Sequence, residues 1–472
     1  MQNNIINPKT IALSLLTLGL TVSSCDDYLS DIPKGNKMPQ TYKDFEAFLR
    51  DEHSIHTIDP GQTIILMNDR YPTMSNLNYY EYWAANYNWD EAADRIALNK
   101  GDETPYYAGY AGISTCNLIL EYGPDLTECT EAQRQELMAQ ARVLRAMNYF
   151  YLVNYYADTY ESGTASSKGG VPLITSAAVG ASYSQPSVQE IYDFILKDMT
   201  EAYPSLPQKA ATELHPNQAT ADAFMARVYL QMNNYSNALS HAEKALAYND
   251  SLYNWCEFYE MHADAINDPT NYTSLPAPNA FNYKENYSYR HGASSYNATI
   301  YHLPMERAAE FEEGDTRYLA QWKAYTTGAE TYMRGMTRGM HNWGGMTTVE
   351  AFLIKAECLA RTNRIGEAME TLNKVRETRI LPELYQPLTA NTEAEAIPLI
   401  MRTKRNELIM TTVPFCDARR LNAEGKYLIT PSKEINGQKV QLSANSHLWT
   451  FPFPLGAIEN KGNGNIQQNV SK

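Results

Sequence analysis

Two stretches of the sequence mix aromatic rings with amide and guanidinium groups, a combination that suits the binding of a sugar. The first covers residues 79–89 and interleaves Tyr and Trp with Asn, and the second covers residues 282–301 and adds Arg290 to several Tyr. A sugar ring has an apolar C–H face and a rim of hydroxyls, so flat rings with a polar tip and planar hydrogen-bonding groups suit it. With two Trp from the segment that follows, the candidate ligand-binding residues are Tyr82, Trp83, Asn86, Trp89, Tyr287, Tyr289, Arg290, Tyr296, Trp322 and Trp343.

Core packing is the competing interpretation of these rings, and for any single ring it is the more common outcome. For the set as a whole, the composition favours a binding surface. The chain has 35 Tyr against 12 Phe, and Tyr is the ring whose hydroxyl needs water or a hydrogen-bond partner.

Motifs for catalysis and metal binding are missing from the sequence. His53 and His56 lie close together, but two ligands do not make a zinc site. No HExxH, GxSxG, phosphate-binding loop or dinucleotide fingerprint occurs. Carboxylate pairs at 102–103 and 312–313 are typical of solvated charge, whereas a glycosidase needs two carboxyls roughly 5 to 9.5 Å apart. We expect no catalytic residue, no metal and no cofactor, and a glycosidase is the less favoured alternative.

Composition indicates a globular protein that does not bind nucleic acid. The 472 residues are 44% hydrophobic and 20% charged, which is enough to bury a large core. The formal net charge is −15 and no cluster of Lys and Arg occurs, whereas a nucleic-acid partner would require a basic stripe.

The N-terminus has the features of an export signal. Lys9 precedes an apolar run at residues 11–22, which is too short to span a bilayer, and Ser23-Ser24-Cys25 follows. The Cys resembles that of a bacterial lipobox, which implies a lipoprotein signal peptide at 1–24, a lipid on Cys25 and a linker at 25–40. A plain secretory signal with an incidental Cys is the alternative.

The remaining cysteines contain no CxxC motif and are odd in number, so most are expected to be small buried hydrophobes. A disulfide between Cys116 and Cys129 is conceivable in an oxidising compartment. These cysteines are Cys116, Cys129, Cys256, Cys358 and Cys416.

Small residues at helical spacing predict two helical hairpins, at 218–249 and 350–379, each close in length to a tetratricopeptide unit of about 34 residues. Such pairs cannot bury their faces alone, so further helices must stack beside them. Helices are predicted at 42–50, 104–121, 131–156, 187–203 and 393–410, with capping boxes at Thr130 and Ser187.

The segments between these helices are predicted to be irregular. Residues 57–100 are interpreted as surface loop, residues 252–343 as an aromatic-rich excursion from the helical scaffold, and the chain after residue 410 as coil. The Gly314-Asp315-Thr316-Arg317 motif is interpreted as a structural turn with an Asp/Arg pair. The predicted fold is all-α, with tetratricopeptide-like helix pairs and long irregular loops in a single domain at 41–472.

A series of short motifs, in order along nearly the whole chain, resembles the SusD/RagB family of Bacteroidetes surface lipoproteins. After Glu407-Leu408 the family usually shows Glu-Gly-x-Arg, and Thr411 to Pro414 stands there instead. The motifs that carry the resemblance are Cys25 to Leu29, Leu144 to Tyr156, Val171 to Leu173, Ile191-Tyr192, Asp198, Leu206-Pro207, Gly314 to Arg317, Arg402 to Leu421, Phe451 to Pro454, Ile458 to Asn460 and Gln468-Asn469.

The resemblance implies an all-helical, lipid-anchored protein on the outside of the outer membrane. It also implies a partner, a SusC-type TonB-dependent transporter over which the lipoprotein sits as a lid. Together with the aromatic stretches, it predicts a surface protein that captures an oligo- or polysaccharide and passes it to that transporter. A peptide- or protein-binding lipoprotein of the same architecture is the alternative, since repeat scaffolds bind peptides in their grooves.

Overall fold

The computed structural model describes residues 39–51, 55–100, 104–270, 272, 275–291, 301–339, 341–435 and 437–471. Several predictions therefore lie outside the described residues. These are the signal peptide at 1–24, the lipid on Cys25, nearly all of the linker at 25–40, the candidate Tyr296, and the carboxylates Asp102 and Glu103.

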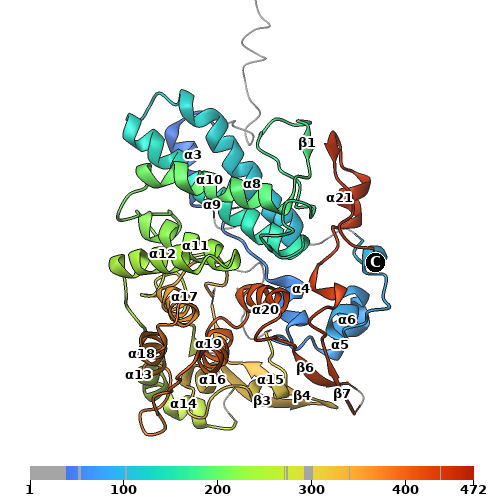
Figure 1. Cartoon of the computed structure of the whole chain (residues 1–472), viewed down its shortest axis with the longest axis vertical. Helices are drawn as coiled ribbons and strands as arrows, with labels where there is room; N and C mark the ends of the chain where they lie inside the picture. The colour runs from blue at the N-terminus through green and yellow to red at the C-terminus, as the bar shows by residue number, and fades with distance from the viewer. Residues whose placement is uncertain are drawn as a thin grey trace, which may run out of the picture.

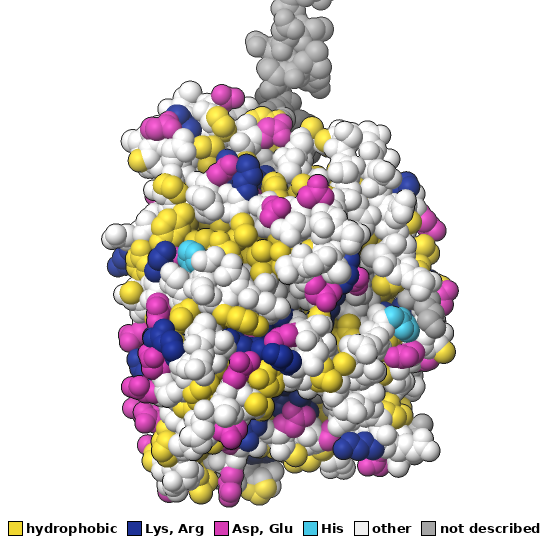
Figure 2. Space-filling view, viewed as in Figure 1, with side chains coloured by type: hydrophobic (Ala, Val, Ile, Leu, Met, Phe, Trp, Pro, Cys, Tyr) yellow, Lys and Arg dark blue, Asp and Glu magenta, His cyan; other side chains and the backbone are white. Residues whose placement is uncertain are grey.

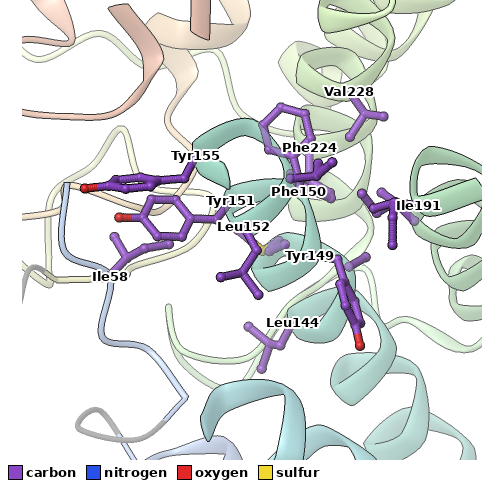
Figure 3. Packing of buried hydrophobic residues seen from close by; sticks show 14 of the residues in the cluster. Ile58, Leu144, Tyr149, Phe150, Tyr151, Leu152, Tyr155, Ile191, Phe224 and Val228 are labelled. Carbon is purple, nitrogen blue, oxygen red and sulfur yellow. The ribbon is translucent and has the colours of Figure 1, made fainter. Parts of the chain in front are cut away.

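A group of long helices forms one end of the molecule (Figure 1). Helix α9 packs between α8 and α10, and its side chains from Leu137 onward are almost all buried. Figure 3 shows Tyr149 to Tyr155 of α9 packed against Ile191 of α10 and Phe224 and Val228 of α11. The predicted capping boxes at Thr130 and Ser187 are both present. The helices here are α3 (Tyr42–Leu49), α8 (Thr104–Tyr122), α9 (Glu131–Tyr156) and α10 (Val188–Ala202), with short 3-10 turns at Gly123–Asp125 and Tyr203–Ser205.

The two helical hairpins lie side by side, although about a hundred residues separate them in the chain (Figure 1). Asn233 and Asn363 turn the chain at φ +57° and +62°, a left-handed conformation that Asn tolerates better than most residues. The small side chains predicted to face each other are buried between the helices. The helices are α11 (Gln218–Gln231) with α12 (Tyr235–Tyr248), α17 (Thr348–Arg361) with α18 (Ile365–Arg376), and α19 (Glu393–Glu407), which packs on the second pair.

The excursion between the hairpins contains more regular structure than the sequence predicted. Its main feature is an antiparallel hairpin of β3 and β4, in which Tyr325 lies opposite Tyr332. Its elements are α13 (Trp255–Met261), α14 (Ala263–Asn267), β2 (Leu275–Pro276), α15 (Met305–Ala308), α16 (Thr316–Gln321), β3 (Trp322–Thr327), β4 (Glu330–Gly335) and β5 (Thr337–Arg338), which pairs with β2.

The prediction of surface loop at 57–100 was wrong. The segment folds into four short helices, the first of which is buried from Gln62 to Leu66. Helices of four to seven residues show too few turns for an apolar period to be visible in the sequence. They are α4 (Gly61–Leu66), α5 (Met74–Tyr79), α6 (Glu81–Tyr87) and α7 (Arg95–Leu98).

The predicted coil after residue 410 was also wrong in part. Pro414 lies in the first turn of α20, where its missing N–H costs nothing, and Gly425 ends that helix in a left-handed conformation. The later elements are α20 (Val413–Glu424), β6 (Ser432–Ile435), β7 (Gln438–Gln441), a 3-10 turn at His447–Trp449, α21 (Leu455–Glu459) and β8 (Gly464–Asn465), which pairs with β1 (Tyr183–Ser184).

A buried charge network ties the excursion to the helical scaffold. Arg379 donates to Glu285 at 2.8 Å and to Glu407 of α19 at 3.1 Å, and Glu407 also accepts from Arg317. Arg317 pairs in turn with Asp315, as predicted for the turn at Gly314, whose φ is +78°. Because the side chains of this network are at most 6% exposed, they stay charged only while they are paired with one another.

Glu357 of the second hairpin lies inside the protein and not on a solvated helix face. Glu357 is fully buried and accepts a 2.8 Å hydrogen bond from Arg420 of α20. Lys355 and Arg364 do reach solvent, where they pair with Glu243 and Glu367.

The cysteines Cys116, Cys129, Cys256, Cys358 and Cys416 are all free, and all except Cys129 are buried. The conceivable disulfide between Cys116 and Cys129 is therefore absent from this structure. In the part of the chain that the structure describes, no helix is both long enough and apolar enough to cross a membrane.

Candidate functional site

Most of the candidate ligand-binding residues are buried, which contradicts the expectation that they form an exposed surface. Trp83 retains partial exposure, and Tyr296 lies outside the described residues. The other eight candidates have between 0% and 8% of their surface exposed: Tyr82, Asn86, Trp89, Tyr287, Tyr289, Arg290, Trp322 and Trp343.

In the first stretch, the buried polar groups hold α6 against its neighbours. The Asn86 amide donates to Gln62 of α4 at 3.1 Å and accepts from Arg95 of α7 at 3.2 Å. The Trp89 indole N–H donates to the Leu66 carbonyl at 2.9 Å. These bonds use the groups that were predicted to contact a ligand, so Asn86 and Trp89 are corrected to packing residues.

In the second stretch, the polar groups likewise form hydrogen bonds within the protein. The Tyr287 hydroxyl donates to the Asn249 carbonyl at 2.6 Å. The Arg290 guanidinium donates to Asn148 of α9 at 2.6 Å and to the Ile55 carbonyl at 3.1 Å.

The remaining candidates from the aromatic excursion pack on neighbouring rings and main chain. Tyr289 lies edge-on to Phe281, and Trp343 lies edge-on to Tyr301 with ring centroids 4.4 Å apart. The Trp322 indole donates to the Tyr301 carbonyl at 3.4 Å. We therefore reassign these candidates from ligand binding to packing: Tyr287, Tyr289, Arg290, Trp322 and Trp343. Tyr82 of α6 is 8% exposed and belongs to the main core cluster.

An exposed group of rings does remain where α5 meets α6, and we call Tyr79, Tyr80 and Trp83 the aromatic platform. Tyr79 and Tyr80 are 77% and 44% exposed. Their rings meet edge to face with centroids 4.7 Å apart, and Tyr80 stacks on Trp83 at 4.9 Å. Tyr80 both ends α5 and begins α6 with an extended backbone. This bend gathers rings from two short helices into one cluster.

Arg70 lies against this platform, and no described residue forms a hydrogen bond with its guanidinium, although the buried Asp59 carboxyl acts on its charge. Its Cζ is 4.9 Å from the Trp83 ring centroid and 4.6 Å from that of Tyr301. Only 8% of Arg70 is exposed, and burial lowers the pKa of its guanidinium. The buried Nε has no hydrogen-bond partner among the described residues. A guanidinium held in this way places a cation and its N–H groups beside exposed rings, a combination that suits a sugar.

The residue before Arg70 fixes its position. Asp69 accepts a 2.6 Å hydrogen bond from Arg307 of α15 and a 3.1 Å hydrogen bond from Arg405 of α19. The Arg405 side chain also donates to the Met67 carbonyl at 2.9 Å. Three segments that are far apart in the sequence therefore meet directly behind the platform.

A row of tyrosines extends from Arg70 to the β3–β4 hairpin. Tyr71 stacks on Tyr332 of β4 with centroids 5.2 Å apart, and Tyr332 contacts Tyr325 of β3 at 5.8 Å. Glu330 joins the hairpin to α5, because its Oε1 accepts from the Tyr71 hydroxyl at 2.9 Å and from the Met74 amide at 2.7 Å. The platform and the hairpin therefore belong to one connected surface.

A buried lysine supports α6 from the other side. Lys433 of β6 lies 3.6 Å from the Tyr87 ring centroid and 4.1 Å from that of Trp89, and it donates to the Tyr87 carbonyl at the end of α6. A cation is favourable at a helix C-terminus. Burial lowers the pKa of Lys433 to about 7.

Within the described ranges, no three His, Cys, Asp or Glu side chains are arranged to hold a metal. Of the adjacent carboxylates at 312–313, Glu312 is paired with Arg376 at 3.0 Å and with Arg402 at 2.8 Å.

Comparison with known proteins matches part of the chain to a family model. The SusD-like family model described as "Starch-binding associating with outer membrane" matches residues 27–230, a range that includes the platform and Arg70. Residues 27–230 of this chain are therefore similar to the SusD-like family. A curated relative, SusD-like protein P2 of Formosa agariphila, is 29% identical over 138 residues, and the match spans 28% of this chain and 25% of that protein's length.

Solved structures show the same fold over nearly the whole chain. A SusD superfamily protein from Bacteroides thetaiotaomicron has a TM-score of 0.67 at 17% identity and covers 91% of this chain and 100% of its own. One from Bacteroides vulgatus has a TM-score of 0.69 at 14% identity, with 91% and 99% covered. A laminarin-binding SusD-like protein has a TM-score of 0.60 at 16% identity, with 92% and 100% covered. The tetratricopeptide-like pairs of the chain are thus part of a SusD-like fold.

The SusD-like fold of this chain positions its platform with elements that the sequence did not reveal. Of the residues that face the surface, only Trp83 was among the candidates. Tyr79 and Tyr80 lie in the predicted aromatic stretch and were passed over, whereas the run Asn78-Tyr79-Tyr80-Glu81, with polar residues on both sides of two rings, indicates solvent exposure. Nothing in the sequence indicated a role for Arg70, because its contacts with the Trp83 and Tyr301 rings arise from tertiary structure alone.

Proposed function

We propose that this chain is a cell-surface glycan-binding protein that captures an oligo- or polysaccharide and passes it to a SusC-type TonB-dependent transporter in the outer membrane. The observation that carries the proposal is the aromatic platform with Arg70 beside it. Exposed Tyr rings supply apolar area for the C–H face of a sugar, and the guanidinium supplies donors for its hydroxyls. The family description and the laminarin-binding relative support the same class of ligand.

The proposed location is the outer membrane, through a lipid on Cys25. The family description, which refers to association with the outer membrane, supports this placement, and the lipobox-like sequence supplies the attachment point. A linker at 25–40 would separate the single domain at 41–472 from the lipid surface. The transporter partnership rests on the family resemblance.

Affinity electrophoresis tests the proposal directly. The wild-type protein is run through gels that contain starch, laminarin and other neutral and acidic polysaccharides, and retardation by at least one of them is expected. Tyr80→Ala should reduce that retardation, and Tyr248→Ala on α12, a residue of similar exposure (42%), should not. If no polysaccharide retards the wild-type protein, glycan binding is refuted.

A groove on the second hairpin favours peptide binding as the alternative function. It has a volume of about 580 Å³ and is lined by α17, α18 and the segment after α18, with Phe352, Leu359 and Tyr385 beside charged side chains. Figure 2 shows acidic and basic side chains gathered along the edge of the molecule where Figure 1 places α18. Binding of a peptide library with no retardation by any glycan would select this function.

The proposed activity is binding without catalysis. A sensitive assay for the release of reducing sugar from any polysaccharide that binds should stay at background. Release that persists through purification and is lost on substitution of a carboxylate would select the glycosidase alternative.

A further inference from the structure

One face of the β3–β4 hairpin combines two cations with two tyrosine rings. Lys323 lies directly opposite Arg334, and Tyr325 lies directly opposite Tyr332. Because alternate residues of a strand share a face, all four side chains are on the same side of the hairpin. Lys323, Tyr325 and Arg334 are partly exposed, and the Arg334 Cζ lies 5.1 Å from the Tyr325 ring centroid. We call these four residues the cationic hairpin face.

This arrangement places like charges opposite each other, which destabilises a strand pair. Burial lowers the pKa of Lys323, and Asp268 opposes that effect from nearby; the Lys323 ammonium donates to the Asp268 carbonyl at 2.5 Å. Arg334 forms no ion pair within the described part of the chain, and its guanidinium lies over the rings of Tyr272 and Tyr325.

Two other titratable groups lie near Arg334, and among the described residues neither forms an ion pair with it, although the Glu330 carboxyl is on the same face of β4. The Oε1 of Glu330 already accepts from the Tyr71 hydroxyl and the Met74 amide. His302, which stacks on Tyr332, is neutral at physiological pH, because burial first and nearby Arg70 and Arg334 second lower its pKa to about 4. The positive charge of Arg334 is therefore available to a ligand.

We propose that the cationic hairpin face is a second subsite, which binds the carboxylate or sulfate group of an acidic sugar in the glycan held by the aromatic platform. The inference rests on the proposed function and adds the class of glycan. A guanidinium pairs with a carboxylate or sulfate through two parallel hydrogen bonds, and the Tyr325 ring beside it offers an apolar surface to the sugar that carries the anion.

The two subsites are physically continuous. Tyr332 stacks on Tyr71, the neighbour of Arg70, and Glu330 fixes the start of α5, which leads to Tyr79. A single extended glycan is therefore able to contact the platform with one residue and the hairpin with another. The net charge of −15 on the whole chain slows the approach of a polyanion, but it does not set the sign of this local surface.

The test compares acidic polysaccharides with their neutral counterparts. Binding of polygalacturonate and of its carboxyl-reduced form is measured by titration calorimetry, as is binding of chondroitin sulfate and of its desulfated form. For at least one pair, the wild-type protein should bind the acidic member roughly tenfold more tightly, the scale of one or two charged hydrogen bonds. Added salt should reduce this preference.

Arg334→Gln should abolish the preference, and Arg334→Lys, which keeps the charge and loses the forked geometry, should retain part of it. The matched control is Arg50→Gln, which removes the same charge from the exposed end of α3 at the opposite end of the molecule from β3 and β4 (Figure 1). This control should bind as the wild type does.

Three outcomes are informative. Equal affinity for both members of each pair, or an unchanged preference in folded Arg334→Gln, overturns the acidic subsite and leaves glycan binding intact. Loss of the preference in Arg50→Gln as well would show a general effect of net charge and would also overturn it. No binding of any glycan, acidic or neutral, would instead refute the proposed function itself.

Discussion

The guanidinium of Arg70 lies 4.9 Å from the ring centroid of Trp83, and no carboxylate pairs with it among the described residues. Trp83 also stacks on Tyr80, so it is held on two sides and positions the more exposed Tyr rings. The platform is rigid for this reason, and a rigid ring loses little entropy when it binds a ligand. The consequences can be tested one residue at a time.

Removal of an exposed ring should weaken glycan binding without unfolding the protein. For Tyr79→Ala and Tyr80→Ala we expect a loss of roughly threefold to tenfold in affinity, the range of one aromatic contact. Trp83→Ala should weaken binding too, because it releases Tyr80. Titration calorimetry against a polysaccharide that binds measures the effect, with Tyr248→Ala as the control. Unchanged affinity in all three platform variants would show that ligands bind elsewhere.

Trp89→Ala should lower the free energy of unfolding. Its ring is 8% exposed and its indole donates to Leu66, so truncation leaves a cavity and an unsatisfied carbonyl. We expect a loss of about 3 to 5 kcal/mol in the free energy of unfolding, measured by chemical denaturation followed by circular dichroism. If Trp89→Ala is as stable as the wild type but has lost glycan binding, Trp89 is a ligand-binding residue after all.

The stability that the buried charge network contributes should depend on Glu407. Glu407→Gln removes the charge that faces Arg317 and Arg379, both buried. Uncompensated buried charge costs about 3 to 5 kcal/mol, and urea denaturation should show a loss of that order. Glu367→Gln provides the comparison, because its pair with Arg364 is exposed and exposed ion pairs contribute little to stability. Equal effects of the two substitutions would contradict the assigned role.

Lys433 should make stability rise with pH above neutrality. Burial holds its pKa in the folded protein at about 7, below the ordinary value of 10.5. Between these values the unfolded chain binds a proton that the folded protein has released. The free energy of unfolding therefore gains up to about 1.4 kcal/mol per pH unit from this group, whereas below both pKa values the cost of burying the charge is fully present.

The measurement for Lys433 is urea denaturation at intervals from pH 6.5 to 9. Lys433→Met should flatten the curve relative to the wild type, because the titrating group is gone. Lys439→Met, on the exposed side of the same β6–β7 hairpin, should leave the slope as it was. Parallel curves for the wild type and Lys433→Met would show that Lys433 titrates normally.

The lipid anchor should depend on one cysteine. Cells that express the wild-type protein should incorporate radioactive palmitate into it, and Cys25→Ala should abolish the labelling. Cys129→Ala, which alters a free and partly exposed cysteine within the fold, should label normally. Labelling that persists in Cys25→Ala would refute the lipobox interpretation.

Local signals explain the parts of the fold that the sequence predicted well. Helix α9 begins at the residue after Thr130, as its capping box indicated, and the Asn residues at 233 and 363 mark the turns of both hairpins. Each of these features depends on residues within a few positions of one another. The short helices of residues 57–100 were missed, because each is stabilised mainly by contacts with distant segments such as the Arg95 bonds to His447, Leu448 and Thr450.

The sequence by itself determined the helical class, the paired hairpins, the family resemblance and the presence of aromatic residues in two stretches. Only the tertiary structure decided which of those residues face solvent. Tyr287 and Arg290 are buried because Asn249 and Asn148 satisfy their polar groups, and Tyr79 and Tyr80 are exposed because no distant segment of the described residues covers them. Whether a ring binds a ligand or fills the core depends on what folds over it, and adjacent residues do not encode that.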